Sequence, residues 1–349
     1  MKLSFISSTA IQNAMRQTIR QAQNEMTSAS TEATTGVYAD IGVALGSSTS
    51  LNVNLTREVS RIDSILSSNS IANQRMTTSQ TALTGMGTQA QNLMDQLVAL
   101  SGNTDGSSVA LAQQTATSTL SSVIASANTM VNGEYLFAGT NTDVQPMTDN
   151  SSATNADIQS KLTTYMANQS PPVTATTISA AQITDFITNT VAPMFTSDSS
   201  WSSWSSASDQ NMTSRINNSE VIETSTNSNS SGMKYLALAT SVTNALMGTP
   251  PGLNQSAVNA VTQQAISYTR QSIDGLNSQA SQLGLSQSRL SDANTTLNSQ
   301  KTILNTSIGD LTGVDPYEAS TKVNSLQTQL ETAYTIVSKI QQLSLVNYL

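Results

Sequence analysis

The sequence predicts a mainly α-helical protein: a long helical-bundle or coiled-coil rod made from both chain ends, with a small β-containing middle domain. Apolar residues recur at three- and four-residue steps over long stretches on both sides of the middle, as amphipathic helices require. Only 10% of the 349 residues are charged and 4% are aromatic, so narrow helical seams suit the chain better than a compact core. Between about residues 141 and 232 the periodicity weakens, and prolines and serines accumulate.

The first helix is predicted to begin at Thr9, because Thr9 and Gln12 have the spacing of a capping box. Its apolar pattern fades near Gly36, and the stretch Gly36–Ser50, which contains three glycines, is predicted to be a linker. A second helix is predicted for Leu51–Leu100, where seam positions alternate at steps of four and three.

A third helix is predicted for Ser108–Val131, and Tyr135–Ala138 after the next turn has strand character. The segment from 141 to 232 is predicted to be a small separate domain, partly β. Trp201 and Trp204 within it could form a sugar- or surface-binding aromatic pair. We favour the alternative that they anchor the core of this domain.

Helical periodicity returns near Met233 and runs, with a break at Gly248–Gly252, into a ladder of six leucines. They stand seven residues apart, at Leu276, Leu283, Leu290, Leu297, Leu304 and Leu311. A strict seven-residue repeat places one apolar stripe, here roughly 50 Å long, on a helix that needs a partner helix. We expect this partner to lie in the same chain, with self-dimerisation as the alternative.

The last helix is predicted to start at Asp315, which is a plausible N-cap followed by Pro316 at the first helical position. The layout is then nearly a palindrome, which predicts three parts. Residues 1–45 plus 310–349 form a terminal helical assembly domain, 46–140 plus 233–309 form a helical rod domain, and 141–232 form a small variable outer domain.

Two sets of candidate residues follow from the apolar seams. The candidates for subunit interfaces are Ile11, Met15, Ile19, Met26, Val323, Leu326, Leu330, Val337, Ile340, Leu343, Leu345, Tyr348 and Leu349. The candidates for the rod core are Leu55, Ile62, Leu66, Leu83, Leu97, Leu276, Leu283, Leu290, Leu297, Leu304 and Leu311.

The composition argues against an enzyme. The chain has no cysteine and no histidine, which removes the commonest nucleophile–base pairs, zinc sites and disulfides. The acidic residues are scattered, and no phosphate loop or metal-binding motif of known spacing occurs. We therefore expect no catalytic residues, no metal and no cofactor. The net charge of −8 argues against a nucleic-acid partner.

The start of the chain lacks the apolar core and cleavage site of a signal peptide. No apolar run approaches the roughly 18 residues of a membrane span. We expect no membrane insertion, and either a cytosolic protein or export without a cleaved signal. The absence of cysteine fits a protein that crosses membranes unfolded.

Three segments carry a resemblance to a known family. They are Gly133–Thr140 (GEYLFAGT), Asp315–Ala319 (DPYEA) and Gln342–Leu349 (QLSLVNYL). With the long helices at both ends, the chain resembles the bacterial flagellin superfamily, and its ending is similar to that of the proteins at the junction between hook and filament. One segment departs from the filament proteins, because Thr34–Ala44 lacks the flagellin-type run Ser-Ser-Gly-Leu-Arg-Ile-Asn.

The resemblance implies a structural role in the extracellular flagellum. It implies self-assembly into a ring, contact with hook-associated protein 1 and with flagellin, a cytosolic export chaperone, and export through the flagellar type III apparatus. Filament flagellin is the first alternative. A secreted helical effector or receptor-like coiled coil is the second.

Overall fold

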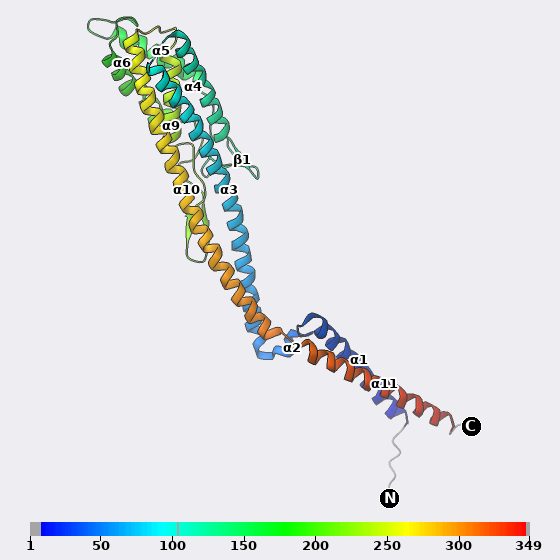
Figure 1. The fold of residues 1–349 in the computed structure, drawn as a ribbon. Coiled ribbons are helices and arrows are strands. Elements are labelled where there is room, and N and C mark those ends of the chain that lie inside the picture. Colours follow the sequence, from blue (N-terminus) through cyan, green and yellow to red (C-terminus); the bar gives the residue numbers. More distant parts are fainter. Residues whose placement is uncertain (1–7, 103–104, 347–349) are drawn as a thin grey trace. The chain divides into compact units, whose positions relative to one another are not determined.

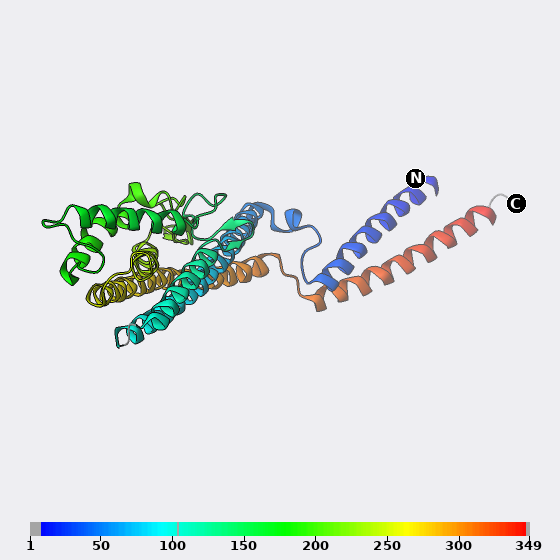
Figure 2. The same ribbon diagram turned by 90° about the horizontal axis from the view of Figure 1, so that it is seen from above.

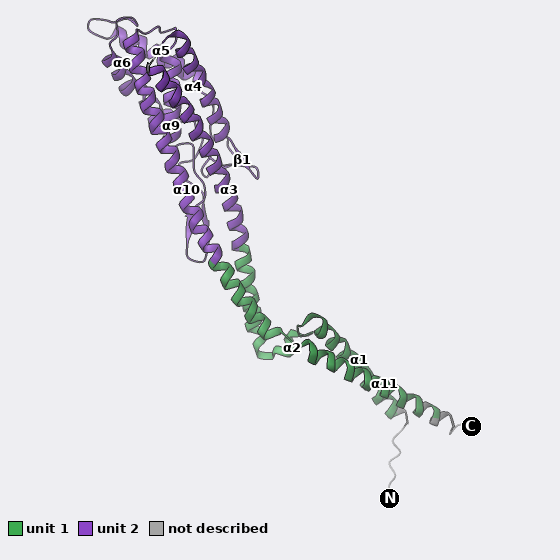
Figure 3. Ribbon diagram, in the orientation of Figure 1, with its two compact units in different colours: residues 1–64, 296–349 green, residues 65–295 purple. Residues whose placement is uncertain are grey.

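The computed structural model describes residues 8–102 and 105–346. The chain folds into two compact units, shown in two colours in Figure 3. Unit 1 comprises residues 1–64 and 296–349, and unit 2 comprises residues 65–295. Two long helices, α3 (Thr49–Gly102) and α10 (Gln255–Thr312), contribute residues to both units. The predicted fold class is confirmed, because long helices come from both chain ends.

Unit 1 is built on the pairing of the two terminal helices. Helix α1 (Ser8–Thr35) packs against α11 (Pro316–Val346), and Figures 1 and 2 show them next to each other. The predicted start of α11 is confirmed. The Asp315 carboxylate accepts a 2.8 Å hydrogen bond from the backbone N–H of Tyr317, and Pro316 is the first helical residue.

The connections that flank these helices lie together in unit 1. Gly36 ends α1 with a φ of +69°, a conformation that glycine adopts without strain. Val37 then forms an antiparallel β-bridge with Gly313, the residue that follows α10. The backbone N–H of Tyr38 donates to the carbonyl of Thr312 at 3.0 Å, so the two connections are tied by main-chain bonds.

The segment predicted to be a linker contains two short helices, α2 (Ile41–Leu45) and the 3₁₀-helix η1 (Gly46–Ser48). Asp40 explains the first of them, because its carboxylate accepts a 2.9 Å hydrogen bond from the N–H of Val43 and caps α2. The predicted linker is therefore partly helical at these residues.

The most buried helix of unit 2 is α9 (Ser231–Leu246), and other helices of the unit pack around it. Apolar residues occur all round α9, as a buried helix requires, and α4, α5 and α7 pack against it. The other helices that lie wholly in unit 2 are α4 (Gly106–Ala127), α5 (Ser151–Ala167), α6 (Ala180–Phe186), the π-helix η2 (Ile187–Val191), α7 (Pro193–Thr196) and α8 (Asp198–Trp201).

Two small antiparallel sheets complete the described part of unit 2. Strand β1 (Met130–Val131) pairs with β2 (Glu134–Tyr135), and β3 (Thr213–Arg215) pairs with β4 (Val221–Glu223). The helix predicted for Ser108–Val131 therefore ends earlier than expected, at Ala127. The Asn-Gly turn between β1 and β2 explains this, because both of its residues have positive φ, the hairpin conformation.

The middle of the chain is more helical than its sequence suggested. The range 141–232 contains α5 to α8 as well as the β3–β4 hairpin. Trp201 and Trp204 stack with ring centroids 6.1 Å apart, and both are almost fully buried. The tryptophans therefore belong to the core of unit 2 and do not form an exposed binding pair.

The leucine ladder changes its environment along α10. Its first four leucines are at most 3% exposed, whereas Leu304 and Leu311 are half-buried. The rod-core candidates outside the ladder also include both buried and half-buried residues. Ile62, Leu83 and Leu97 are buried, and Leu55 and Leu66 are half-buried.

Among the described helices, none is long and apolar enough to cross a membrane.

Candidate assembly surface

The terminal helices meet along a narrow line of apolar residues, which we call the terminal seam. Leu326 and Leu330 on α11 are 5% and 6% exposed, and Ala29 on α1 is fully buried. The other described candidates are less well covered. Met15, Ile19, Met26, Val323, Val337 and Ile340 are half-buried, and Ile11 is exposed. Pairing within one chain thus leaves much of the seam accessible to a further helix.

Little besides apolar contact joins α1 to α11. The Gln23 side-chain amide donates a 2.9 Å hydrogen bond to the Tyr334 hydroxyl across the pair. Among the described residues of these two helices, no ion pair links one helix to the other. Packing therefore carries the pairing, and the strength of packing depends on how much apolar area it removes from water.

A shallow groove runs between α1 and α11. Its volume is about 390 Å³, and Met15 from α1 and Ile336 from α11 supply large apolar side chains to its wall. Ile336 is 39% exposed. The remaining lining residues are Thr18, Thr328, Gln329, Thr332 and Ala333. We call this feature the terminal groove. Ile336 and Ala333 are absent from the interface candidates, although both continue the three- and four-residue steps of α11.

The remaining interface candidates lie at the end of the chain. Leu343 and Leu345 belong to α11, but their side chains are not among those the structure describes. Tyr348 and Leu349 lie outside the described residues. All four stay predictions.

The GEYLFAGT segment is held in unit 2 by contacts that the sequence did not reveal. Arg75 on α3 is 7% exposed, forms an ion pair with Glu134 at 2.6 Å and donates to the carbonyl of Tyr135 at 2.7 Å. Phe137 is fully buried, and its carbonyl accepts a hydrogen bond from Ser228. Nothing in the sequence around Arg75 pointed to this contact.

Both terminal helices and the GEYLFAGT segment match models of a known protein family. The profile of the bacterial flagellin N-terminal helical region matches residues 6–142, and that of the flagellin C-terminal helical region matches residues 266–349. Together the two matches cover more than half of the chain, including both terminal helices and the GEYLFAGT segment. The chain belongs to the bacterial flagellin family. As a member of this family, it is a structural protein of the bacterial flagellum.

Solved structures include one of the same fold. The flagellin-family chain is similar to a proposed flagellar hook-associated protein from Vibrio parahaemolyticus, with a TM-score of 0.54 and 11% sequence identity. The alignment covers 76% of this chain and 97% of the other. At this identity the likeness concerns the fold alone. No curated protein matches the sequence.

Proposed function

We propose that this flagellin-family protein forms the junction between the hook-side adaptor and the filament, the role of hook-associated protein 3. The observation that carries the proposal is the ending Gln342–Leu349, which is similar to that of the junction proteins. The segment Thr34–Ala44 supports it, because it departs from the run typical of filament flagellins. Filament flagellin is the second candidate, favoured by the matches at both chain ends. A secreted helical effector is the third and weakest.

The geometry of unit 1 supports a role in which copies of the chain assemble through their terminal helices. The terminal seam is incompletely covered by one chain, so a neighbouring copy gains buried apolar area by packing onto it. Residues 1–45 with 310–349 would then act as the assembly part, 46–140 with 233–309 as the rod, and 141–232 as the outer part. Assembly of copies into a ring would give one face to the hook-side adaptor and one to flagellin.

The proposed partners are copies of the same chain, hook-associated protein 1, flagellin and a cytosolic export chaperone. The chaperone would shield the terminal seam before export, because exposed apolar surface invites association. Export would use the flagellar type III apparatus without a cleaved signal. No catalytic step belongs to this role.

Deletion of the gene tests the junction proposal in cells. We expect hooks without filaments by electron microscopy, and flagellin released into the medium by immunoblotting. Restoring the full chain should bring back filaments. Complete filaments of flagellin in the deleted strain would contradict the proposal.

A seeding experiment separates the junction from the filament protein. Purified chain is added to sheared filament seeds, and growth is followed by electron microscopy. A junction protein should stop after a few layers. Continued growth of long filaments would support the filament alternative instead.

A further inference from the structure

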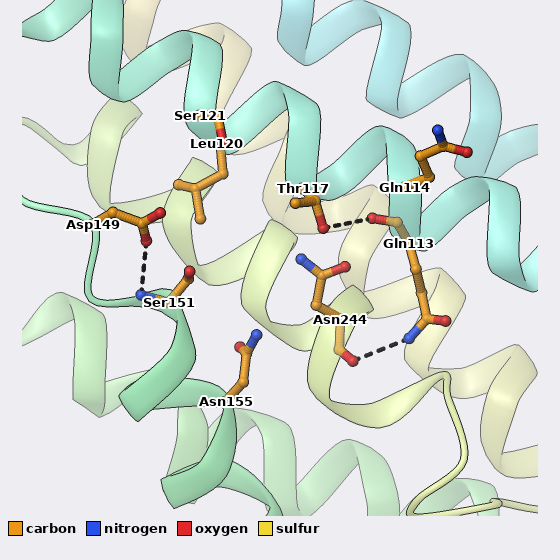
Figure 4. Close-up of a pocket in the computed structure, with 9 residues that line it drawn as sticks. All are labelled: Gln113, Gln114, Thr117, Leu120, Ser121, Asp149, Ser151, Asn155 and Asn244. Atoms are coloured by element: carbon orange, nitrogen blue, oxygen red, sulfur yellow. Dashed lines mark hydrogen bonds between the residues drawn. The ribbon is translucent and has the colours of Figure 1, made fainter.

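Two pockets of unit 2 differ in how closely they define a ligand. The first lies between α4, α5 and α9, and Figure 4 shows the residues that line it. Its amides, hydroxyls and single carboxylate offer donors and acceptors together, so polar molecules of many kinds would fit it. The second is a groove of about 350 Å³ between the β3–β4 hairpin and α10. It contains main-chain groups of fixed direction and spacing, which restrict what can bind there.

One edge of strand β4 has free main-chain groups. At one end of the β3–β4 ladder, the backbone N–H of Thr224 donates to the carbonyl of Met212 at 2.9 Å. Bonded pairs in an antiparallel ladder recur at every second residue, so Ile222 bonds to β3 while Val221 and Glu223 do not. The N–H and C=O groups of Val221 and Glu223 therefore point away from β3. None of these four groups has a hydrogen-bond partner among the described residues.

The free edge of β4 faces a groove whose other wall is α10. The lining residues of α10 are spaced three and four apart, as one face of a helix requires. They are Gln279, Gln282, Leu283, Leu285, Ser286 and Arg289. The ion pair between Arg289 and Glu220, at 3.3 Å, lies at one end of the groove. From Gln279 to Arg289 the helix rises by roughly 15 Å, the length of about four or five residues of an extended chain.

The side chains along the groove define a pattern for an added strand. Val221 and Leu285 are apolar, yet 51% and 64% exposed. Because side chains alternate along a strand, Val221 and Glu223 project from the outer face of the hairpin, and Ile222, which is 3% exposed, projects from its inner face. A partner residue opposite Ile222 would therefore point towards α10 and Leu285. The exposed Glu223 carboxylate accepts a 3.2 Å hydrogen bond from Asn211 and places a negative charge on the outer face.

We propose that this edge binds an extended peptide of a partner protein as a third strand, antiparallel to β4. An extended chain can pair with all four free main-chain groups at their spacing of two residues. The residue opposite Ile222 is apolar and covers Leu285, and the residue opposite Val221 is apolar as well. The residue opposite Glu223 is basic. In the antiparallel direction, the partner therefore has the order basic, apolar, apolar. The groove belongs to unit 2, so binding there does not depend on assembly of the terminal helices.

The experiment uses the full chain labelled with ¹⁵N and the probe peptide acetyl-Thr-Lys-Leu-Val-Thr-amide. We expect saturable NMR shifts of the Val221 and Glu223 backbone amides. Methylation of the valine nitrogen in the peptide removes a donor that points at β4, and should weaken binding by about tenfold or more. Methylation of the leucine nitrogen removes a donor that points away from β4, and should leave binding unchanged.

Three results would overturn the proposal. They are the absence of a saturable shift with the parent peptide, an equal loss of binding from both methylations, and shifts of the same amides that grow with protein concentration before peptide is added. The last result would assign the edge to a second copy of the chain.

Two substitutions with matched controls test the side-chain contacts. Leu285→Gln removes the apolar wall at similar size and should weaken binding by about fivefold. Ile303→Gln, at a position 66% exposed on the same helix, should bind as wild type. Glu223→Gln can still accept from Asn211 but lacks the charge. It should weaken binding of the lysine peptide by about threefold, as expected for an exposed ion pair, and leave a norleucine peptide unaffected. Unchanged binding in Leu285→Gln, or an equal loss for both peptides in Glu223→Gln, would contradict the proposed pairing.

Discussion

Gly232 on α9 and Gly275 on α10 lie so close that neither position has room for a side-chain carbon. A Cβ on Gly275 would lie 2.6 Å from the backbone nitrogen of Gly232, and a Cβ on Gly232 would lie 2.7 Å from that of Leu276. The hydroxyl of Ser272 donates a buried 2.8 Å hydrogen bond to the carbonyl of Gly232. The start of the most buried helix in unit 2 therefore rests directly on the backbone of α10.

Gly275→Ala should destabilise unit 2 by about 1–3 kcal/mol, because backbone atoms must move to admit the methyl group. Both tryptophans of the chain are buried in unit 2, so urea unfolding followed by tryptophan fluorescence measures the change. Gly85→Ala is the matched control. Gly85 lies within α3 with nothing near its Cβ position, and alanine there should stabilise by roughly 0.5–1 kcal/mol. Equal effects of both substitutions would contradict the close contact.

The leucine ladder supplies a second prediction. Leu290 is 2% exposed, and Leu290→Ala should lower the free energy of unfolding by about 2–5 kcal/mol through lost burial and a residual cavity. Leu285→Ala, at a position 64% exposed on the same helix, should change it by less than about 0.5 kcal/mol. Fluorescence-detected denaturation of both variants makes the comparison.

The same experiment tests whether the partner of the ladder lies within the chain. Because the structure buries Leu290 in a single chain, the loss in Leu290→Ala should not depend on protein concentration. A melting temperature that rises steeply with concentration would indicate self-dimerisation instead.

Much of the helical framework could be predicted because its signals are local. Helix α11 begins where Asp315 and Pro316 place it, and the leucine spacing lies on the single helix α10. The contact between Gly232 and Gly275 could not be predicted, since a glycine in a sequence does not reveal which backbone approaches it. Arg75 was missed for a similar reason, because its partner Glu134 belongs to a hairpin far along the chain.

The middle segment shows where periodicity fails. Helix α5 buries Thr154, Ile158 and Leu162 in steps of four, but serine, threonine and asparagine fill its other positions and weaken the apolar pattern.

In the candidate assembly surface, the spacing of residues such as Leu326 indicated an apolar seam on α11. The nearly palindromic layout predicted that the two chain ends lie together, and α1 packs against α11. Apolar spacing alone could not show which seam residues this pairing buries.

A third prediction concerns alkaline pH. Tyr268 is 8% exposed and stacks on Tyr235 with ring centroids 6.0 Å apart. Burial raises the pKa of Tyr268 above its usual value, the neighbouring Tyr235 adds to the rise, and a hydrogen bond with Thr188 lowers it in part. The folded state therefore favours the protonated phenol. Its contribution to stability is complete below the unfolded pKa of about 10 and is lost as pH rises through the folded pKa.

Melting curves above and below pH 10 measure this contribution. The melting temperature of the wild type should fall as the pH rises, and it should fall less in Tyr268→Phe, which has no phenol to ionise. Tyr317→Phe alters a side chain that is 82% exposed and should follow the wild type. The same alkaline loss in Tyr268→Phe as in the wild type would show that other groups cause it.

The last prediction concerns the terminal groove and rests on the proposed assembly. Ile336→Glu places a carboxylate in the wall of this groove, where a neighbouring subunit would have to bury it. Because Ile336 is already 39% exposed in the single chain, the monomer should keep its helical content and melting curve by circular dichroism. Cells that carry only this variant should be non-motile and lose flagellin to the medium.

Ser338→Glu is the matched control, since residues two positions apart are separated by about 200° around a helix and lie on nearly opposite faces. It adds the same charge at an exposed site that does not line the groove, so cells should swim. Normal swimming with Ile336→Glu would show that assembly leaves the terminal groove open, and the neighbouring subunit would then have to pack elsewhere on α1 and α11.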